Sequence, residues 1–231
     1  MTETRSKKKS GFFSNMLFNI IAPALILSKL STEDSLGPVW AVVVALAFPL
    51  VYGGWELLKS GKVNFFSILG IISVLLTGGI SLLQLDPAYI AIKEAMIPAL
   101  IGVAVLISQY TRYPLVKTLL INPEILDIEK LNSALAQSGK TAEFARTTQR
   151  AGFIVAATFF MSAALNYILA KAIVVSLPGT TAYAEELGRM TWLSYPVIAL
   201  PSMVMLMAAI IYIFRQVGRL TGQSLEEFIL N

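Results

Sequence analysis

Six long runs of apolar residues, separated by short polar segments, dominate the chain. The runs cover residues 12–30, 39–58, 65–85, 88–109, 152–177 and 192–214. A transmembrane α-helix needs about 20 mostly apolar residues, and each run has about that length. Turn-forming or charged residues separate them, such as Asp86-Pro87 and Pro178-Gly179. The pattern predicts an all-α protein with a single membrane domain over 1–231, a polytopic bundle of six transmembrane helices.

The composition agrees with this prediction. Hydrophobic residues make up 56% of the chain and charged residues only 14%, whereas soluble domains carry about 25% charged residues. The formal net charge is +4. The basic residues lie between the apolar runs and form no stripe on a soluble face, so nucleic acid is not expected as a partner.

The signs of the charges predict how the chain is threaded. If the N-terminus is inside, the inner segments hold 14 of the 18 Lys and Arg residues: Arg5, Lys7, Lys8, Lys9, Lys59, Lys62, Arg112, Lys117, Lys130, Lys140, Arg146, Arg150, Arg215 and Arg219. The outer segments then hold Glu33, Asp34, Asp86, Glu185 and Glu186 against Arg189. The positive-inside rule therefore predicts cytoplasmic termini, with 1–11 as a basic tail and 111–151 as a cytoplasmic loop.

The first run continues past Ala22-Pro23-Ala24 to Leu30, which favours an uncleaved span over a signal peptide.

The 111–151 loop contains an amphipathic segment. Asn122-Pro123 is typical of a helix start and Gly139 of a helix end. Four apolar residues fall on one face of this helix: Ile125, Ile128, Leu131 and Leu135. The helix either lies along the inner membrane surface or packs on the inner ends of the spans. Residues 224–229 predict a second, shorter surface helix.

Small side chains mark one face of the third run. They are Gly70, Ser73, Thr77 and Ser81, with Gly78 and Gly79 beside them. Lipid gives helices no hydrophobic reason to associate, so small residues that allow close approach commonly form helix interfaces. We interpret this face as a helix-packing surface.

Prolines inside the spans free the carbonyl four residues earlier. In two cases the freed residue is itself polar: Asn19 before Pro23, and Glu94 before Pro98. Such a group could hold a cation or a hydrogen-bonded ligand, or the proline could simply kink the helix. Residues 19–26 also resemble 94–101, which leaves open an inverted repeat of three plus three spans.

A few polar residues lie within the outer third of the spans. Glu94 is costly to bury in hydrocarbon, so we expect it to face the bundle interior and to pair with Lys171 or Lys93. It is either a structural ion pair or a protonatable, ligand-binding carboxylate. Lysines at this depth commonly extend to the headgroups. The candidate binding residues are Glu94, Lys93, Lys171, Asn166 and Asn19.

The chain contains no Cys and no His. Thiol nucleophiles, imidazole bases and most zinc or haem ligation are therefore excluded. No paired acidic motif replaces them, so we expect no catalytic residues, no metal, no cofactor and no enzymatic activity.

Several motifs carry a resemblance. They are residues 64–70 and 73–80, then Asp86-Pro87 and residues 91–95. Together they resemble a family of uncharacterised bacterial inner-membrane proteins over most of the chain. That family is similar to the intracellular septation protein A family, from about Phe65 to the C-terminus. The features shared with septation protein A are Thr77-Gly78-Gly79-Ile80-Ser81-Leu82, Lys93, Pro114-Leu115-Val116-Lys117 and Asn166-Tyr167.

The resemblance implies a multi-pass protein of the bacterial cytoplasmic (inner) membrane. Its role would be in cell-envelope maintenance or division, without catalysis. The expected partners are the lipid bilayer, other inner-membrane or division proteins, and a second copy of the chain. The alternative function is a small-solute or ion-coupled transporter that uses Glu94.

Overall fold

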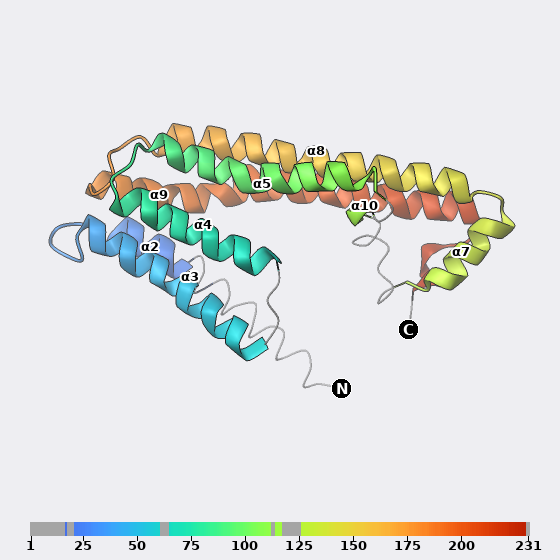
Figure 1. The fold of residues 1–231 in the computed structure, drawn as a ribbon, viewed down its shortest axis with the longest axis horizontal. Coiled ribbons are helices and arrows are strands. Elements are labelled where there is room, and N and C mark those ends of the chain that lie inside the picture. Colours follow the sequence, from blue (N-terminus) through green and yellow to red (C-terminus); the bar gives the residue numbers. More distant parts are fainter. Residues whose placement is uncertain (1–16, 18–20, 61–64, 112–113, 117–125, 230–231) are drawn as a thin grey trace. The chain divides into compact units, whose positions relative to one another are not determined.

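The computed structural model describes residues 17, 21–60, 65–111, 114–116 and 126–229 (Figure 1). Within these residues every regular element is helical, apart from one isolated antiparallel bridge between Leu126 and Ile229. The all-α prediction is therefore confirmed for this part of the chain. The α-helices are α2 (Ala22–Lys29), α3 (Pro38–Ser60), α4 (Phe65–Leu82), α5 (Ala88–Ser108), α7 (Ile128–Gln137), α8 (Thr141–Ile173), α9 (Thr181–Ser194) and α10 (Leu200–Thr221).

Four helical segments are long and apolar enough to cross a membrane: Pro38–Trp55, Ala88–Ser108, Thr141–Ile173 and Thr181–Thr221. A fifth apolar helix, Ile71–Leu82, is shorter and lies in α4. The first predicted span is described only at Leu17 and from Ile21 onward, where it contains α2. The protein is thus a helical membrane protein, and the number of six spans stays a prediction.

Two helices are longer than the hydropathy pattern predicts. α8 begins at Thr141, so residues 141–151 belong to this helix and not to the loop, and it ends at Ile173 instead of continuing to residue 177. Hydropathy marks the hydrocarbon boundary, but only a turn-forming residue stops a helix. Gly139, with φ +65°, supplies that turn before α8.

α9 likewise begins at Thr181, well before the predicted start at residue 192. Its charged residues interrupt the apolar run without interrupting the helix. The π-helical turn η2 (Tyr195–Ala199) joins α9 to α10. Pro196 lies in this turn, and a π-turn accommodates a residue that cannot donate a backbone hydrogen bond.

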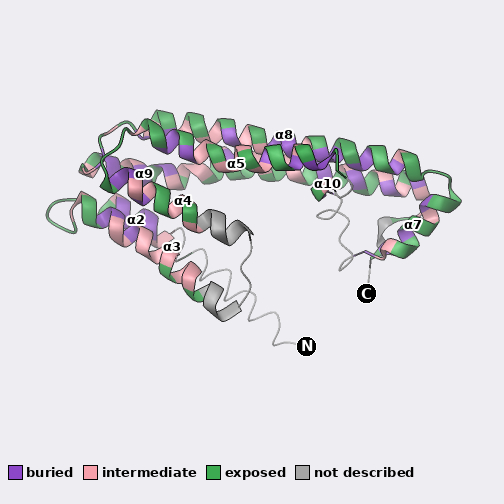
Figure 2. Ribbon diagram, in the orientation of Figure 1, coloured by how far each residue is buried: buried purple, intermediate pink, exposed green. Residues whose placement is uncertain are grey.

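The described chain divides into two compact units. Unit 1 comprises residues 1–97 and 165–198. Its core lies where α2 packs against α9 and α3, and where α3 packs against α4 (Figure 2). Its most buried side chains include Ala24, Ala41, Ala45, Ile90, Tyr183 and Ala184.

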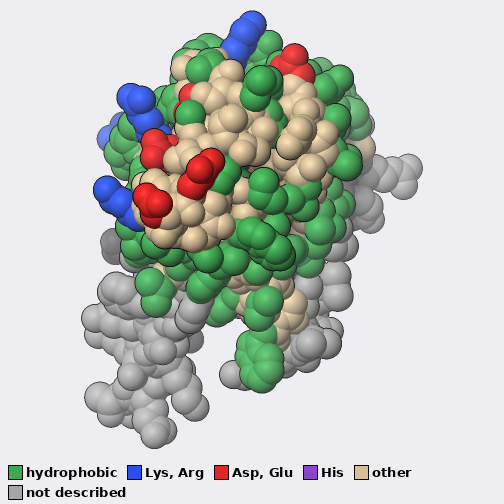
Figure 3. Space-filling view, turned by 90° about the vertical axis from the view of Figure 1, so that its left-hand side faces the viewer, with side chains coloured by type: hydrophobic (Ala, Val, Ile, Leu, Met, Phe, Trp, Pro, Cys, Tyr) green, Lys and Arg blue, Asp and Glu red, His purple; other side chains and the backbone are tan. Residues whose placement is uncertain are grey.

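Three predicted outer loops meet at one end of unit 1. The Thr181 hydroxyl donates to the Ser31 carbonyl over 3.3 Å. A Cβ placed on Gly179 would lie 3.1 Å from the Gln84 amide nitrogen. Loops 30–37, 83–87 and 174–180 therefore lie together. Figure 3 looks at this end and shows a few acidic and basic side chains among hydrophobic ones.

Unit 2 comprises residues 98–164 and 199–231. In it, α7 packs against α10 and the 3-10 helix η3 (Leu225–Phe228). Leu131 and Leu135 are each 1% exposed and Phe228 is fully buried. The apolar face of α7 is thus covered by protein. This favours the alternative in which the helix packs on the ends of the spans over one in which it lies along the membrane surface.

The ends of α7 are defined by two residues. Asp127 caps its N-terminus, because its carboxylate accepts from the Lys130 amide over 2.9 Å. The predicted helix start, Asn122-Pro123, lies outside the described residues. At the other end Gly139 has φ +65°, which confirms the predicted helix end.

Candidate functional site

The candidate site is a hydrogen-bonded cluster around Lys93 in unit 1. Lys93 lies on α5, within an apolar candidate span, and is only 5% exposed. Its ammonium nitrogen lies 2.6 Å from Glu94 Oε1. It donates to Thr77 Oγ1 over 2.8 Å and to Ser73 Oγ over 3.3 Å, both on α4. An ammonium has three protons, and these three acceptors account for all of them.

The partners on α4 are arranged by helical spacing. Ser73 and Thr77 are four residues apart, so their side chains lie one turn apart on the same face. The Thr77 hydroxyl donates to the Ser73 carbonyl over 3.0 Å. Because its one proton is used there, Thr77 Oγ1 faces Lys93 with its lone pairs.

The cluster continues along α4 to α9. Ser81 donates to the Thr77 carbonyl over 2.7 Å, and its oxygen lies 2.9 Å from the Tyr183 hydroxyl. Since the Ser81 proton is committed to Thr77, Tyr183 must be the donor in that pair. A continuous chain of polar contacts therefore runs from Glu94 through Lys93, Thr77 and Ser81 to Tyr183.

The structure pairs Glu94 with the nearer of its two predicted partners. Glu94 is half-buried, with 25% of its side chain exposed, and Lys93 is the more buried of the two. Lys93 therefore does not extend toward the headgroups. Lys171 is exposed and its ammonium lies 5.6 Å from the centre of the Tyr167 ring, a cation–π distance.

The structure describes one of the two predicted asparagines. Asn166 lies on α8 in unit 1 and is partly buried. Asn19 lies outside the described residues. Of the candidate binding residues, the structure brings together Lys93 and Glu94, and it adds Ser73 and Thr77 to them.

The small-residue face of α4 has two parts. Gly78 is buried against α3, where a Cβ would lie 3.1 Å from Leu46 Cδ1. A Cβ on Gly79 would meet nothing within 4 Å. Ser73, Thr77 and Ser81 form the polar contacts described above, and Gly70 lies on the same helix. The face is thus a packing surface at Gly78 and a polar surface along the other three residues.

Two residues of unit 1 were missed by the sequence reasoning. Tyr183 is fully buried, and the small residues Ala182 and Ala184 around it were a signal of close packing. Glu186 binds the turn that follows α8: its carboxylate accepts from the backbone amides of Val175 and Ser176, each over 2.9 Å, and from the Ser176 hydroxyl over 2.7 Å. In the sequence, Glu186 stands out only as one of the acidic residues of the predicted outer segments.

A family model described as intracellular septation protein A matches residues 12–132, more than half of the chain. The chain belongs to the intracellular septation protein A family. The match to the family expected from the sequence covers residues 12–132, so it begins and ends earlier than the expected range from about Phe65 to the C-terminus. No curated protein and no solved structure matched the chain.

The septation protein A match contains most of the Lys93 cluster. Ser73, Thr77, Lys93 and Glu94 all lie within residues 12–132, whereas Tyr183 lies outside them. Among the described residues of this septation protein A relative, no group of three acidic side chains is placed to hold a metal ion. The cluster's chemistry is therefore that of one ammonium, one carboxylate and hydroxyl groups.

Proposed function

We propose that this chain is a non-enzymatic, multi-pass protein of the bacterial cytoplasmic membrane with a role in cell-envelope maintenance or division. The family match over residues 12–132 carries the proposal. The long apolar helices support it, since they suit a protein that works in the bilayer. Its partners would be other inner-membrane or division proteins, with a second copy of the chain as a further candidate.

The proposal includes six spans with both termini in the cytoplasm. The clustering of loops 30–37, 83–87 and 174–180 at one end of unit 1 supports this threading. Reporter fusions after Ser35 and after Lys140 test it. A reporter fused after Ser35 should lie outside the cytoplasm, and a reporter fused after Lys140 should lie inside it. Activity of both on the same side would contradict the threading.

A deletion strain tests the cellular role. We expect loss of the gene to produce misplaced or delayed septa, or sensitivity to envelope stress, and the wild-type chain to restore normal cells. Complementation by a chain carrying Lys93→Met and Glu94→Gln asks whether the buried pair is needed. Normal division and envelope integrity in the deletion strain, under osmotic and detergent stress, would count against the proposal.

One observation favours a second candidate, an ion- or small-solute-coupled transporter. The Lys93–Glu94 pair lies within an apolar span, where charged residues are rare and commonly mark ion or proton pathways. Glu94 would be the protonatable or ligand-binding carboxylate.

Proteoliposomes separate the two candidates. A pH-sensitive dye inside the vesicles reports proton flux while a panel of solutes is applied outside. Coupled flux that is lost in Glu94→Gln and kept in Glu185→Gln, an exposed carboxylate of α9, would favour transport. Absence of proton flux with every solute of the panel would favour the role in cell-envelope maintenance or division.

A further inference from the structure

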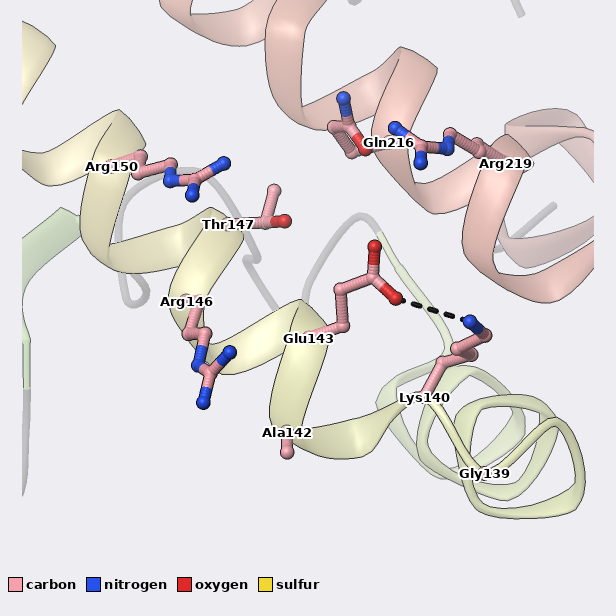
Figure 4. Close-up of a pocket in the computed structure, with 9 residues that line it drawn as sticks. All are labelled: Gly139, Lys140, Ala142, Glu143, Arg146, Thr147, Arg150, Gln216 and Arg219. Atoms are coloured by element: carbon pink, nitrogen blue, oxygen red, sulfur yellow. Dashed lines mark hydrogen bonds and ion pairs between the residues drawn. The ribbon is translucent and has the colours of Figure 1, made fainter.

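Unit 2 contains a polar pocket between the first turns of α8 and the last turns of α10. Its volume is about 420 Å³, within the range of small-molecule sites. Figure 4 shows Thr147 and Arg150 of α8 facing Gln216 and Arg219 of α10 across this space. Lys140 and Arg146 line its border. The pocket lies outside residues 12–132, the part of the chain that matches the septation protein A family.

The pocket has an excess of positive charge. Four of its lining residues are cations and one, Glu143, is an anion. Glu143 accepts from Lys140 over 3.2 Å, so its charge is already paired. Within the part of the chain that the structure describes, Arg146, Arg150 and Arg219 form no ion pair. Arginines stay protonated at any physiological pH, so this site favours an anion.

The position of the pocket along the helices identifies the kind of anion. Residues 151–170, which follow Arg150, include no Asp, Glu, Lys or Arg. At about 1.5 Å per residue this stretch is about 30 Å long, the thickness of the hydrocarbon core. On α10 the uncharged stretch 190–214 ends next to Arg215, and Arg219 follows one turn later. Arg150 and Arg219 therefore lie at the depth of lipid phosphates.

The geometry points to a binding site for the phosphate of an anionic phospholipid headgroup between α8 and α10. The forked guanidinium groups of Arg150 and Arg219 suit the two free oxygens of a phosphodiester. Thr147 and Gln216 add a hydroxyl and an amide as uncharged donors for the rest of the headgroup. Basic pockets between helices at the cytoplasmic side of a membrane commonly bind such lipids.

Native mass spectrometry of the purified full chain in detergent tests the site. The protein is delipidated and titrated with phosphatidylglycerol, with phosphatidylcholine as the zwitterionic comparison. We expect tighter binding of phosphatidylglycerol. The double variant Arg150→Gln, Arg219→Gln should weaken that binding about tenfold or more, since it removes charge-assisted hydrogen bonds.

Three controls make the result specific. Arg215→Gln removes the same charge from the same helix without touching the pocket, so it should leave phosphatidylglycerol affinity close to that of the wild type. Arg150→Lys with Arg219→Lys keeps the charge and loses the fork, so part of the affinity should remain. Unchanged thermal unfolding of each variant shows that the fold is intact.

Several results would overturn the assignment. Equal affinity for the two lipids would remove the need for an anionic headgroup, and equal losses in Arg215→Gln and in the pocket variant would mean diffuse attraction. Displacement of the lipid by millimolar inorganic phosphate would make a soluble phosphate compound the ligand instead.

Discussion

The Lys93 ammonium on α5 donates to the Thr77 hydroxyl on α4 over 2.8 Å. The lysine is thus held by a neighbouring helix instead of by water or headgroups. Its other two protons face Ser73 and Glu94. Because the contacts come from two helices, they couple the position of α4 to that of α5. The two members of the ion pair are therefore held unequally: Lys93 is more deeply buried and has further partners on α4, whereas Glu94 is partly exposed.

This inequality gives the first prediction. Glu94→Gln leaves the buried Lys93 charge without a counter-charge, whereas Lys93→Met removes the charge and fills a similar volume. Breaking a fully buried pair from one side costs about 3–5 kcal/mol. Glu94 is 25% exposed, so we expect Glu94→Gln to lower the free energy of unfolding by about 2 kcal/mol and Lys93→Met by less than about 1 kcal/mol.

Unfolding in mixed detergent micelles measures both variants. The double variant should resemble Lys93→Met alone, because Glu94 matters through the lysine. Equal losses for the two single variants, or a stable Glu94→Gln protein, would show that the pair is not a buried unit.

Thr77 provides a second test of the cluster. Thr77→Val keeps the branched shape and removes the oxygen that accepts from Lys93. Hydrogen bonds to charged groups contribute about 1.5–3 kcal/mol, so a loss of about 2 kcal/mol in the free energy of unfolding is expected. Thr191→Val on α9 is the matched control: its hydroxyl donates only to the Leu187 carbonyl of its own helix. A similar loss in both variants would mean that the contact with Lys93 adds nothing.

Much of the fold could be predicted because hydrocarbon imposes a simple pattern on sequence. The all-α class, the apolar spans and the turn at Gly139 all followed from hydropathy and from the conformational freedom of glycine. Helix ends did not follow. α8 begins at Thr141 because charged residues end an apolar run without ending a helix. The sequence also indicated that Glu94 needs a cation, but which lysine supplies it depends on how α4 and α5 pack.

Close helix packing shows the same limit. The small residues of α4 were the expected interface, and Gly78 fulfils it. An equally tight approach is at Gly188 on α9, where a Cβ would lie 3.1 Å from the Ala24 carbonyl and 3.2 Å from the Ser28 amide of α2. Ala184 and Gly188 are four residues apart, a small-residue pair that could have indicated this interface.

Gly188→Ala should therefore separate α2 from α9. The atoms that it meets are two backbone atoms and the Leu27 Cβ, none of which can rotate away, so we expect a loss of about 1–3 kcal/mol in the free energy of unfolding. Gly79→Ala is the control: a Cβ there meets nothing within 4 Å, and alanine is the better helix former. Gly79→Ala should be neutral or stabilising. A neutral Gly188→Ala would show that α2 and α9 are not in close contact.

Glu186 gives the last prediction, because its carboxylate closes the turn after α8. It accepts two backbone amides and one hydroxyl from Val175 and Ser176. Glu186→Ala leaves these donors to water, at a cost of about 2 kcal/mol in the free energy of unfolding, since Glu186 is only partly buried. Glu185→Ala removes the same charge from an exposed neighbour and gains the same helix propensity. It should leave stability nearly unchanged. Limited proteolysis gives a second measurement: cleavage within 174–180 should accelerate in Glu186→Ala alone. Equal cleavage in the two variants would mean that the carboxylate acts as a surface charge and does not hold this turn.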